Sequence, residues 1–83
     1  MEDIKKFVVE WFAANTAKSK DEILQNLNAD YLHYGWLDSF KFISFIAAAE
    51  KEFGIAFSND DYRDEKFSTV EGLINVIATK SNA

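Results

Sequence analysis

Apolar residues recur every three or four positions in three segments of the chain, which is the spacing of a helix that buries one face. In residues 2–14 the apolar stripe comprises Ile4, Phe7, Val8, Trp11 and Phe12. In residues 39–53 a sector of about 100° is assigned to the core, and it contains Phe42, Phe45, Ile46, Ala49 and Phe53. In the C-terminal segment a single face carries Val70, Leu73, Ile74 and Ile77. The pattern predicts three substantial helices.

The segments around these helices carry weaker signals. Ser19-Lys20-Asp21-Glu22 has the form of a capping box and predicts a short helix inside the long connection after the first helix. Gly54 suits the left-handed position that ends a helix, and Ser68-Thr69-Val70-Glu71 resembles a second capping box. Residues 57–62 are predicted to form a turn and at most one turn of helix, and residues 80–83 are expected to fray. We expect an all-α fold, a small four-helix bundle of three main helices and one short helix, with a long loop between the first two.

Length and composition indicate a single folded domain. The chain has 83 residues, 48% of them hydrophobic and eight of them Phe. This is too apolar for a disordered segment and too short for two domains. We therefore expect one domain over residues 1–83.

Charge and residue types exclude several functions. The formal net charge of −5 would repel nucleic acid. The absence of Cys excludes disulfides, thiolate zinc sites and a thiol nucleophile. The N-terminal residues show neither a signal peptide nor the roughly 20 apolar residues that a membrane span needs. We expect a cytoplasmic monomer with no membrane span, and Met1 and the short tails suggest a stand-alone chain.

The helix predicted over residues 39–53 leaves apolar residues opposite its core face. Phe40 and Ala47 lie on that side with Ile43 at its margin, and Ser44 and Lys51 lie beside them. Contiguous exposed apolar residues on a helix are typical of a docking surface, although incidental exposure is the simpler alternative.

Ser39 stands at the start of the same helix and has two interpretations. Either Asp38 or Ser39 caps the helix by accepting a hydrogen bond from its first turn, and the residues alone favour this structural role. Alternatively, a hydroxyl that a long loop holds at a helix N-terminus is open to an enzyme that attaches a group to it.

Other polar and aromatic residues give weaker hypotheses. A hydrolytic triad of Ser39 with His33 lacks an orienting acid and a nucleophile elbow. The acidic residues within 59–65 lack the spacing and the Gly of a calcium loop, so a solvated turn is preferred. Tyr34 and Trp36 are expected to anchor the loop, with a partner contact as the alternative.

Several motifs together resemble an acyl carrier protein. Asp38-Ser39-Phe40, preceded by Gly35, stands where that family has Asp-Ser-Leu at the start of its second helix. The similarity continues through Glu50-Lys51-Glu52-Phe53-Gly54-Ile55 to Phe67-Ser68-Thr69-Val70, the run into the last helix. The resemblance covers nearly the whole chain.

The resemblance implies a non-catalytic carrier. Ser39 would bear 4′-phosphopantetheine, donated from coenzyme A by a phosphopantetheinyl transferase, and the thiol of that group would hold acyl or aminoacyl groups as thioesters. Asp38 would help the transferase recognise the site, and Phe40 would be the apolar contact beside the arm. The implied partners are a loading ligase or acyltransferase and downstream synthase or transferase enzymes of lipid or secondary metabolite biosynthesis.

Departures from the family pattern narrow this expectation. Carriers of fatty acid synthesis present carboxylates along this helix to basic enzymes, whereas this chain has Lys41, Ser44 and Lys51 there. We therefore expect a specialised carrier. A D-alanyl or peptidyl carrier is an alternative, although Asp38 favours the acyl type, and a non-carrier helical adaptor is the competing class. The many aromatic core residues favour short, polar or aminoacyl cargo that stays in solvent.

Overall fold

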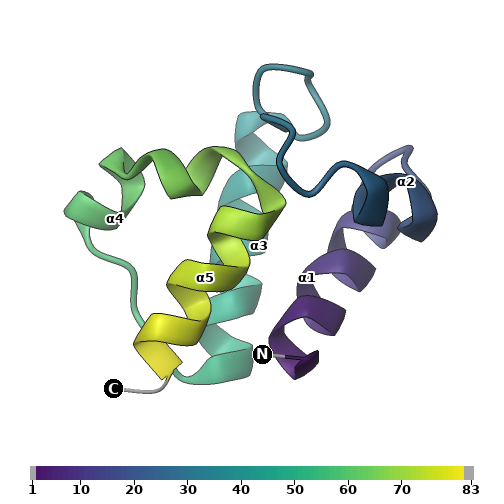
Figure 1. The fold of residues 1–83 in the computed structure, drawn as a ribbon. Helices are drawn as coiled ribbons and strands as arrows, with labels where there is room; N and C mark the ends of the chain where they lie inside the picture. The colour runs from purple at the N-terminus through teal and green to yellow at the C-terminus, as the bar shows by residue number, and fades with distance from the viewer. Residues whose placement is uncertain (1, 82–83) are drawn as a thin grey trace.

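Three long helices, two short ones and a 3-10 segment follow one another along residues 2–81, which are the residues that this computed structural model describes (Figure 1). They are α1 (Glu2–Asn15), α2 (Lys20–Gln25), α3 (Ser39–Phe53), α4 (Asn59–Arg63), η1 (Glu65–Ser68) and α5 (Val70–Ser81). Within those residues the β-type pairing is an isolated bridge between Asp30 and Thr69. The predicted all-α fold and the short helix in the long connection are confirmed. After residue 57 the structure has more than the single turn of helix expected, because the five residues of α4 are followed by η1.

The core lies where the apolar faces of α1, α3 and α5 meet, and its centre is aromatic. Phe12 and Phe45 are fully buried, with ring centroids 5.5 Å apart, and the Trp11 ring lies 5.2 Å from that of Phe45. Of the five predicted core residues of α3, Phe45, Ile46 and Ala49 are buried, and Phe42 and Phe53 are half-buried against them. The helical periodicity therefore identified the core face of α3 correctly.

Local sequence signals set most of the helix ends. The Ser19 hydroxyl accepts a hydrogen bond from the Glu22 N–H at 3.2 Å, and the Glu22 carboxylate accepts one from the Ser19 N–H, so the predicted capping box is confirmed. α3 ends at Gly54, whose φ of 64° lies in the left-handed region that glycine adopts without strain.

The predicted cap of the last helix is wrong by one residue. Ser68 belongs to η1, where its hydroxyl donates to the Glu65 carbonyl at 2.7 Å. Thr69 caps α5 instead, because its hydroxyl accepts a hydrogen bond from the Gly72 N–H at 2.9 Å. A contact from the distant loop holds this register, since the Tyr31 N–H donates to the Ser68 carbonyl at 3.1 Å.

The fraying predicted for residues 80–83 is wrong at Lys80 and Ser81, and residues 82–83 lie outside the described residues. α5 continues through Ser81, and the Lys80 ammonium contacts the Asp61 carboxylate at 2.7 Å. Partial burial opposes ionisation of Asp61, but hydrogen bonds from Lys80 and Ser58 and the charge of Lys80 outweigh it and hold the pKa of Asp61 below its ordinary value. This tertiary ion pair ties the last turn of α5 to α4.

Candidate functional site

The long connection between α2 and α3 arches over the N-terminal end of α3 (Figure 1). Leu37, two residues before the helix, is buried, and the backbone N–H of Trp36 donates to the Tyr31 carbonyl at 2.9 Å. The connection is therefore attached to the bundle on the approach to α3, and the direction in which α3 starts is fixed.

Tyr31 is the principal anchor of this connection, and no periodic pattern in the sequence pointed to it. Its side chain is fully buried, its ring lies 5.2 Å from the Phe12 ring, and its hydroxyl donates to the Phe67 carbonyl. Burial, with a smaller effect from the charge of Asp30, raises the pKa of Tyr31, so the hydroxyl keeps its proton. Tyr31 thereby links the loop before α3 to η1.

The other loop aromatics divide between burial and exposure. Trp36 is half-buried against the core with the Lys18 ammonium 5.8 Å from its ring centroid, which confirms its anchoring role. Tyr34 is 66% exposed and its ring meets that of His33, so the anchoring prediction is wrong for Tyr34. The His33 side chain is exposed, and the backbone N–H of His33 donates to the Asp30 carboxylate at 2.9 Å in a local turn.

Asp38, and not Ser39, caps α3. The Asp38 carboxylate accepts a hydrogen bond from the Lys41 N–H at 2.8 Å, and its carbonyl accepts one from the Phe42 N–H at 2.9 Å. Ser39 is the first residue of the helix and is exposed, and its hydroxyl makes no hydrogen bond within residues 2–81. Asp38 therefore performs the capping that the sequence also offered to Ser39, and the Ser39 hydroxyl is available to another protein.

The outward strip of α3, defined as Phe40, Ile43, Ser44, Ala47 and Lys51, is exposed along its whole length. The side chains of Phe40 and Ile43 are 84% and 67% exposed, the two largest values among the exposed apolar side chains of residues 2–81. The Ser44 hydroxyl donates to the Phe40 carbonyl at 3.0 Å, so its hydrogen bond is made within the helix. The predicted exposure of this strip is confirmed, and it begins one residue after Ser39.

The acidic residues after α3 serve local structure. Asp61 binds Ser58 and Lys80, and the Asp64 carboxylate accepts a hydrogen bond from the Lys66 N–H at 2.9 Å. Residues 2–81 contain no group of three or more His, Cys, Asp or Glu side chains placed to hold a metal ion. Capping and pairing account for Asp61 and Asp64, and Asp60 and Glu65 are exposed.

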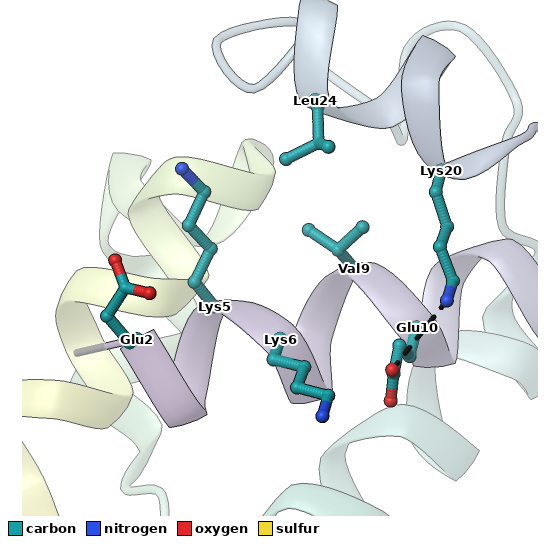
Figure 2. A pocket seen from close by; sticks show the side chains of 7 residues that line it. All are labelled: Glu2, Lys5, Lys6, Val9, Glu10, Lys20 and Leu24. Carbon is teal, nitrogen blue, oxygen red and sulfur yellow. Dashed lines mark ion pairs between the residues drawn. The ribbon is translucent and has the colours of Figure 1, made fainter.

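Hollows on the surface lie away from Ser39. One of about 360 Å³ lies between α1 and α2, where Leu24 points toward Val9 and the Lys20 ammonium is 3.7 Å from the Glu10 carboxylate (Figure 2). A second of about 320 Å³ lies against Trp36. Ser39 lines neither hollow. Ser39 is exposed, so another protein can reach its hydroxyl.

The start of α3 fits a phosphate ester on Ser39. The N–H groups of Ser39 and Phe40 belong to the first turn and have no acceptor within residues 2–81, and a helix N-terminus favours negative charge.

Among the helices of residues 2–81, none has the length and apolar character needed to span a membrane.

Comparison with known proteins agrees with this geometry. The family model described as "Phosphopantetheine attachment site" matches residues 6–77, which include the loop, Ser39, the outward strip and most of α5. Searches of curated proteins and of solved structures gave no significant match. Because the family model spans most of the chain, the protein belongs to the phosphopantetheine attachment site family, the carrier domains that bear a 4′-phosphopantetheine arm.

Proposed function

We propose that Ser39 is the attachment site of 4′-phosphopantetheine and that the protein carries acyl groups on this arm as thioesters. The observation that carries the proposal is the exposed Ser39 hydroxyl, which is free of hydrogen bonds within residues 2–81 because Asp38 performs the capping. A transferase can therefore reach the hydroxyl without breaking any interaction that stabilises α3.

The residues of this chain have simple roles in the attachment. The Ser39 oxygen attacks the phosphoanhydride of coenzyme A, a phosphodiester forms, adenosine 3′,5′-bisphosphate leaves, and a base of the transferase takes the hydroxyl proton. Asp38 is held beside the hydroxyl by its bond to the Lys41 N–H, so it offers the transferase a fixed carboxylate to recognise. The arm supplies the thiol for thioester chemistry, and the chain itself contains no Cys.

We expect incubation with coenzyme A and a broad-specificity phosphopantetheinyl transferase to add the mass of one 4′-phosphopantetheine to the purified protein. Intact-mass spectrometry measures the gain, and fragmentation of the peptide that contains residues 38–41 places it on Ser39. A folded protein that gains no mass with an active transferase would contradict the proposal, as would an adduct on another residue.

The partners follow from the carrier role. We propose a loading ligase or acyltransferase and a downstream synthase or transferase, with the outward strip as the contact surface. The acyl type is favoured over peptidyl carriers because Asp38 precedes Ser39, and a D-alanyl carrier is the alternative. The lysines of α3 further support a specialised pathway over fatty acid synthesis, and turnover by fatty acid synthesis enzymes equal to that of their own carrier would contradict this.

We propose that the cargo stays outside the helical bundle. Edge contacts join the rings of Phe12 and Phe45 to that of Trp11 at centroid separations of 5.9 and 5.2 Å. The Phe7 ring extends this cluster, with its centroid 6.4 Å from that of Phe45 and 5.2 Å from that of Phe53. Opening such a core for an acyl chain costs roughly 1–3 kcal/mol in displaced packing.

Loading a long acyl chain on the arm is accordingly expected to leave the amide chemical shifts of Phe12 and Phe45 close to those of the unacylated holo protein. Heteronuclear NMR of the two forms makes the comparison, intact mass confirms that the chain is loaded, and the apo-to-holo shift changes of Ser39 and Phe40 confirm that the arm is attached beside them. Large shifts at the core positions would show that the chain enters the bundle.

A further inference from the structure

The hollow of about 320 Å³ beside Trp36 lies between the α2 region and the loop that leads to Ser39. It is lined by Lys18, Glu22, Asn26, Ala29, Tyr34 and Trp36. Two of these side chains are aromatic and most of the others are polar. The hollow therefore suits a ligand in which apolar groups alternate with hydrogen-bonding groups.

The charged groups of the hollow balance each other. The Lys18 ammonium lies 3.7 Å from the Glu22 carboxylate, and it also lies 5.8 Å from the centroid of the Trp36 ring. Both charges are thus engaged with neighbours that line the same hollow. A neutral ligand fits this site better than an anion or a cation, because it leaves the pair undisturbed.

Three uncharged polar groups of the hollow are free. The Asn26 side-chain N–H donates to the Glu22 carbonyl at 2.7 Å, but the side-chain oxygen of Asn26 and the hydroxyl of Tyr34 make no hydrogen bond within residues 2–81. The Trp36 indole N–H has no acceptor there either, and it reaches the solvent, since those residues contain no buried side-chain nitrogen without a partner. The hollow therefore offers both donors and an acceptor to a ligand.

The hollow is within reach of a group attached to Ser39. Trp36 precedes Ser39 by three residues, so their Cα atoms are at most about 11 Å apart. The 4′-phosphopantetheine arm has about 13 bonds between phosphorus and sulfur, which is the length of about four extended residues, or roughly 15 Å. An arm on Ser39 is therefore long enough to lie along the loop and enter the hollow.

We propose that the hollow beside Trp36 binds the neutral pantetheine portion of the arm on Ser39. The dimethyl group of the arm would pack on the aromatic rings, and its two amides match the free polar groups of Asn26, Tyr34 and Trp36. This inference rests on the proposed function of Ser39, because only an arm at that residue starts beside this loop.

The tether makes weak binding sufficient. A short flexible link gives the arm an effective concentration in the millimolar range, so a dissociation constant of that order fills the hollow about half of the time. The arm then rests on the loop side of Ser39. The outward strip, which runs along α3 from Phe40, stays uncovered for partner enzymes.

Isotope-filtered NMR of the holo protein tests the proposal. The protein is isotope-labelled and the arm is attached from unlabelled coenzyme A, so that NOEs between arm and protein are observed selectively. We expect NOEs from the dimethyl and methylene protons of the arm to the rings of Trp36 and Tyr34, with an upfield ring-current shift of the dimethyl signals. Trp11, whose ring packs against that of Phe45 in the core, is the internal control and should show no NOE to the arm.

Two variants alter the hollow itself. Ala29→Leu fills it and Tyr34→Ser removes one of its rings, and each is expected to lower the NOE intensities at Trp36 about threefold or more. Leu32→Ser is the matched control, because Leu32 is an exposed apolar residue of the same loop that does not line the hollow, and it should keep the NOEs. The amide spectrum of each variant checks that the fold is retained.

Three results would overturn the proposal: arm NOEs that are absent, arm NOEs that connect to Phe40 and Ile43 in place of Trp36, or arm NOEs that remain unchanged in both hollow variants. Intact mass confirms before the NMR experiment that each protein carries the arm. A missing arm would contradict the proposed function itself, whereas an attached arm without NOEs to Trp36 would contradict only this inference.

Discussion

Ser39→Ala is expected to abolish phosphopantetheinylation while leaving the fold as stable as before. The substitution removes the only atom through which the first residue of α3 can form a phosphodiester, so no adduct should appear by intact mass at any transferase concentration. Stability should change by less than about 0.5 kcal/mol, because the residue is exposed, its hydroxyl bonds to nothing within residues 2–81, and Asp38 still caps the helix. Thermal unfolding followed by circular dichroism measures the change in stability.

Ser44→Ala is the matched control, since Ser44 is an exposed serine of the same helix. The Ser44→Ala protein should accept the arm at the normal stoichiometry, because Ser39 is still present. In the unsubstituted protein the Ser44 hydroxyl donates to the Phe40 carbonyl at 3.0 Å, so its removal takes away no attachment site. An adduct that persists in Ser39→Ala, or one that disappears equally in Ser44→Ala, would show that the attachment site has been assigned to the wrong residue. A large fall in melting temperature for Ser39→Ala would show that the hydroxyl has a structural role.

Gly72→Ala is expected to be the most damaging small substitution in α5. A Cβ at this position would overlap the backbone carbonyl of Lys66, because α5 packs directly on η1 at Gly72. Alanine gains roughly 1 kcal/mol in helix propensity over glycine, but displacing a backbone segment in a packed domain costs about 3 kcal/mol. The net loss of about 2 kcal/mol should lower the melting temperature by roughly 10 °C in a domain of this size.

Asn75→Ala separates this clash from the propensity effect. Asn75 lies on the exposed side of α5, so alanine there meets no backbone and should leave the melting temperature unchanged or slightly higher. If Gly72→Ala melts at or above the temperature of the unsubstituted protein, η1 moves aside at little cost, and the close approach of α5 to Lys66 does not constrain the fold.

Local patterns predicted the helices and most of their ends because short-range physics determines them. The apolar period of α1 and α3, the Ser19 capping box and the left-handed Gly54 each depend on residues within about two turns of helix. For the same reason the outward strip could be identified before any tertiary contact was known. Resemblance to the carrier family added the interpretation of Ser39, which periodicity alone treated as a cap.

The expectations that were wrong all involve contacts between distant segments of the chain. Ser68 has the form of a cap in the sequence, but it is the last residue of η1, and its carbonyl accepts a hydrogen bond from the Tyr31 N–H. Thr69 caps α5 instead. Lys80 was expected to fray and instead pairs with Asp61. Tyr34, which was expected to anchor the loop, is exposed because Tyr31 and Trp36 already hold it.

The sequence by itself determined where the helices form, which face of α3 is buried, and which residues remain to face a partner, since these depend on spacing along one helix. Only the tertiary structure decided that Tyr31 is the residue that ties the loop to η1. The sequence left the cap of α3 open between Asp38 and Ser39, and the local geometry assigns it to Asp38. The physical reason for the first result is that a buried hydroxyl takes whichever partner the packed chain brings within hydrogen-bond distance, and spacing along the sequence does not contain that distance.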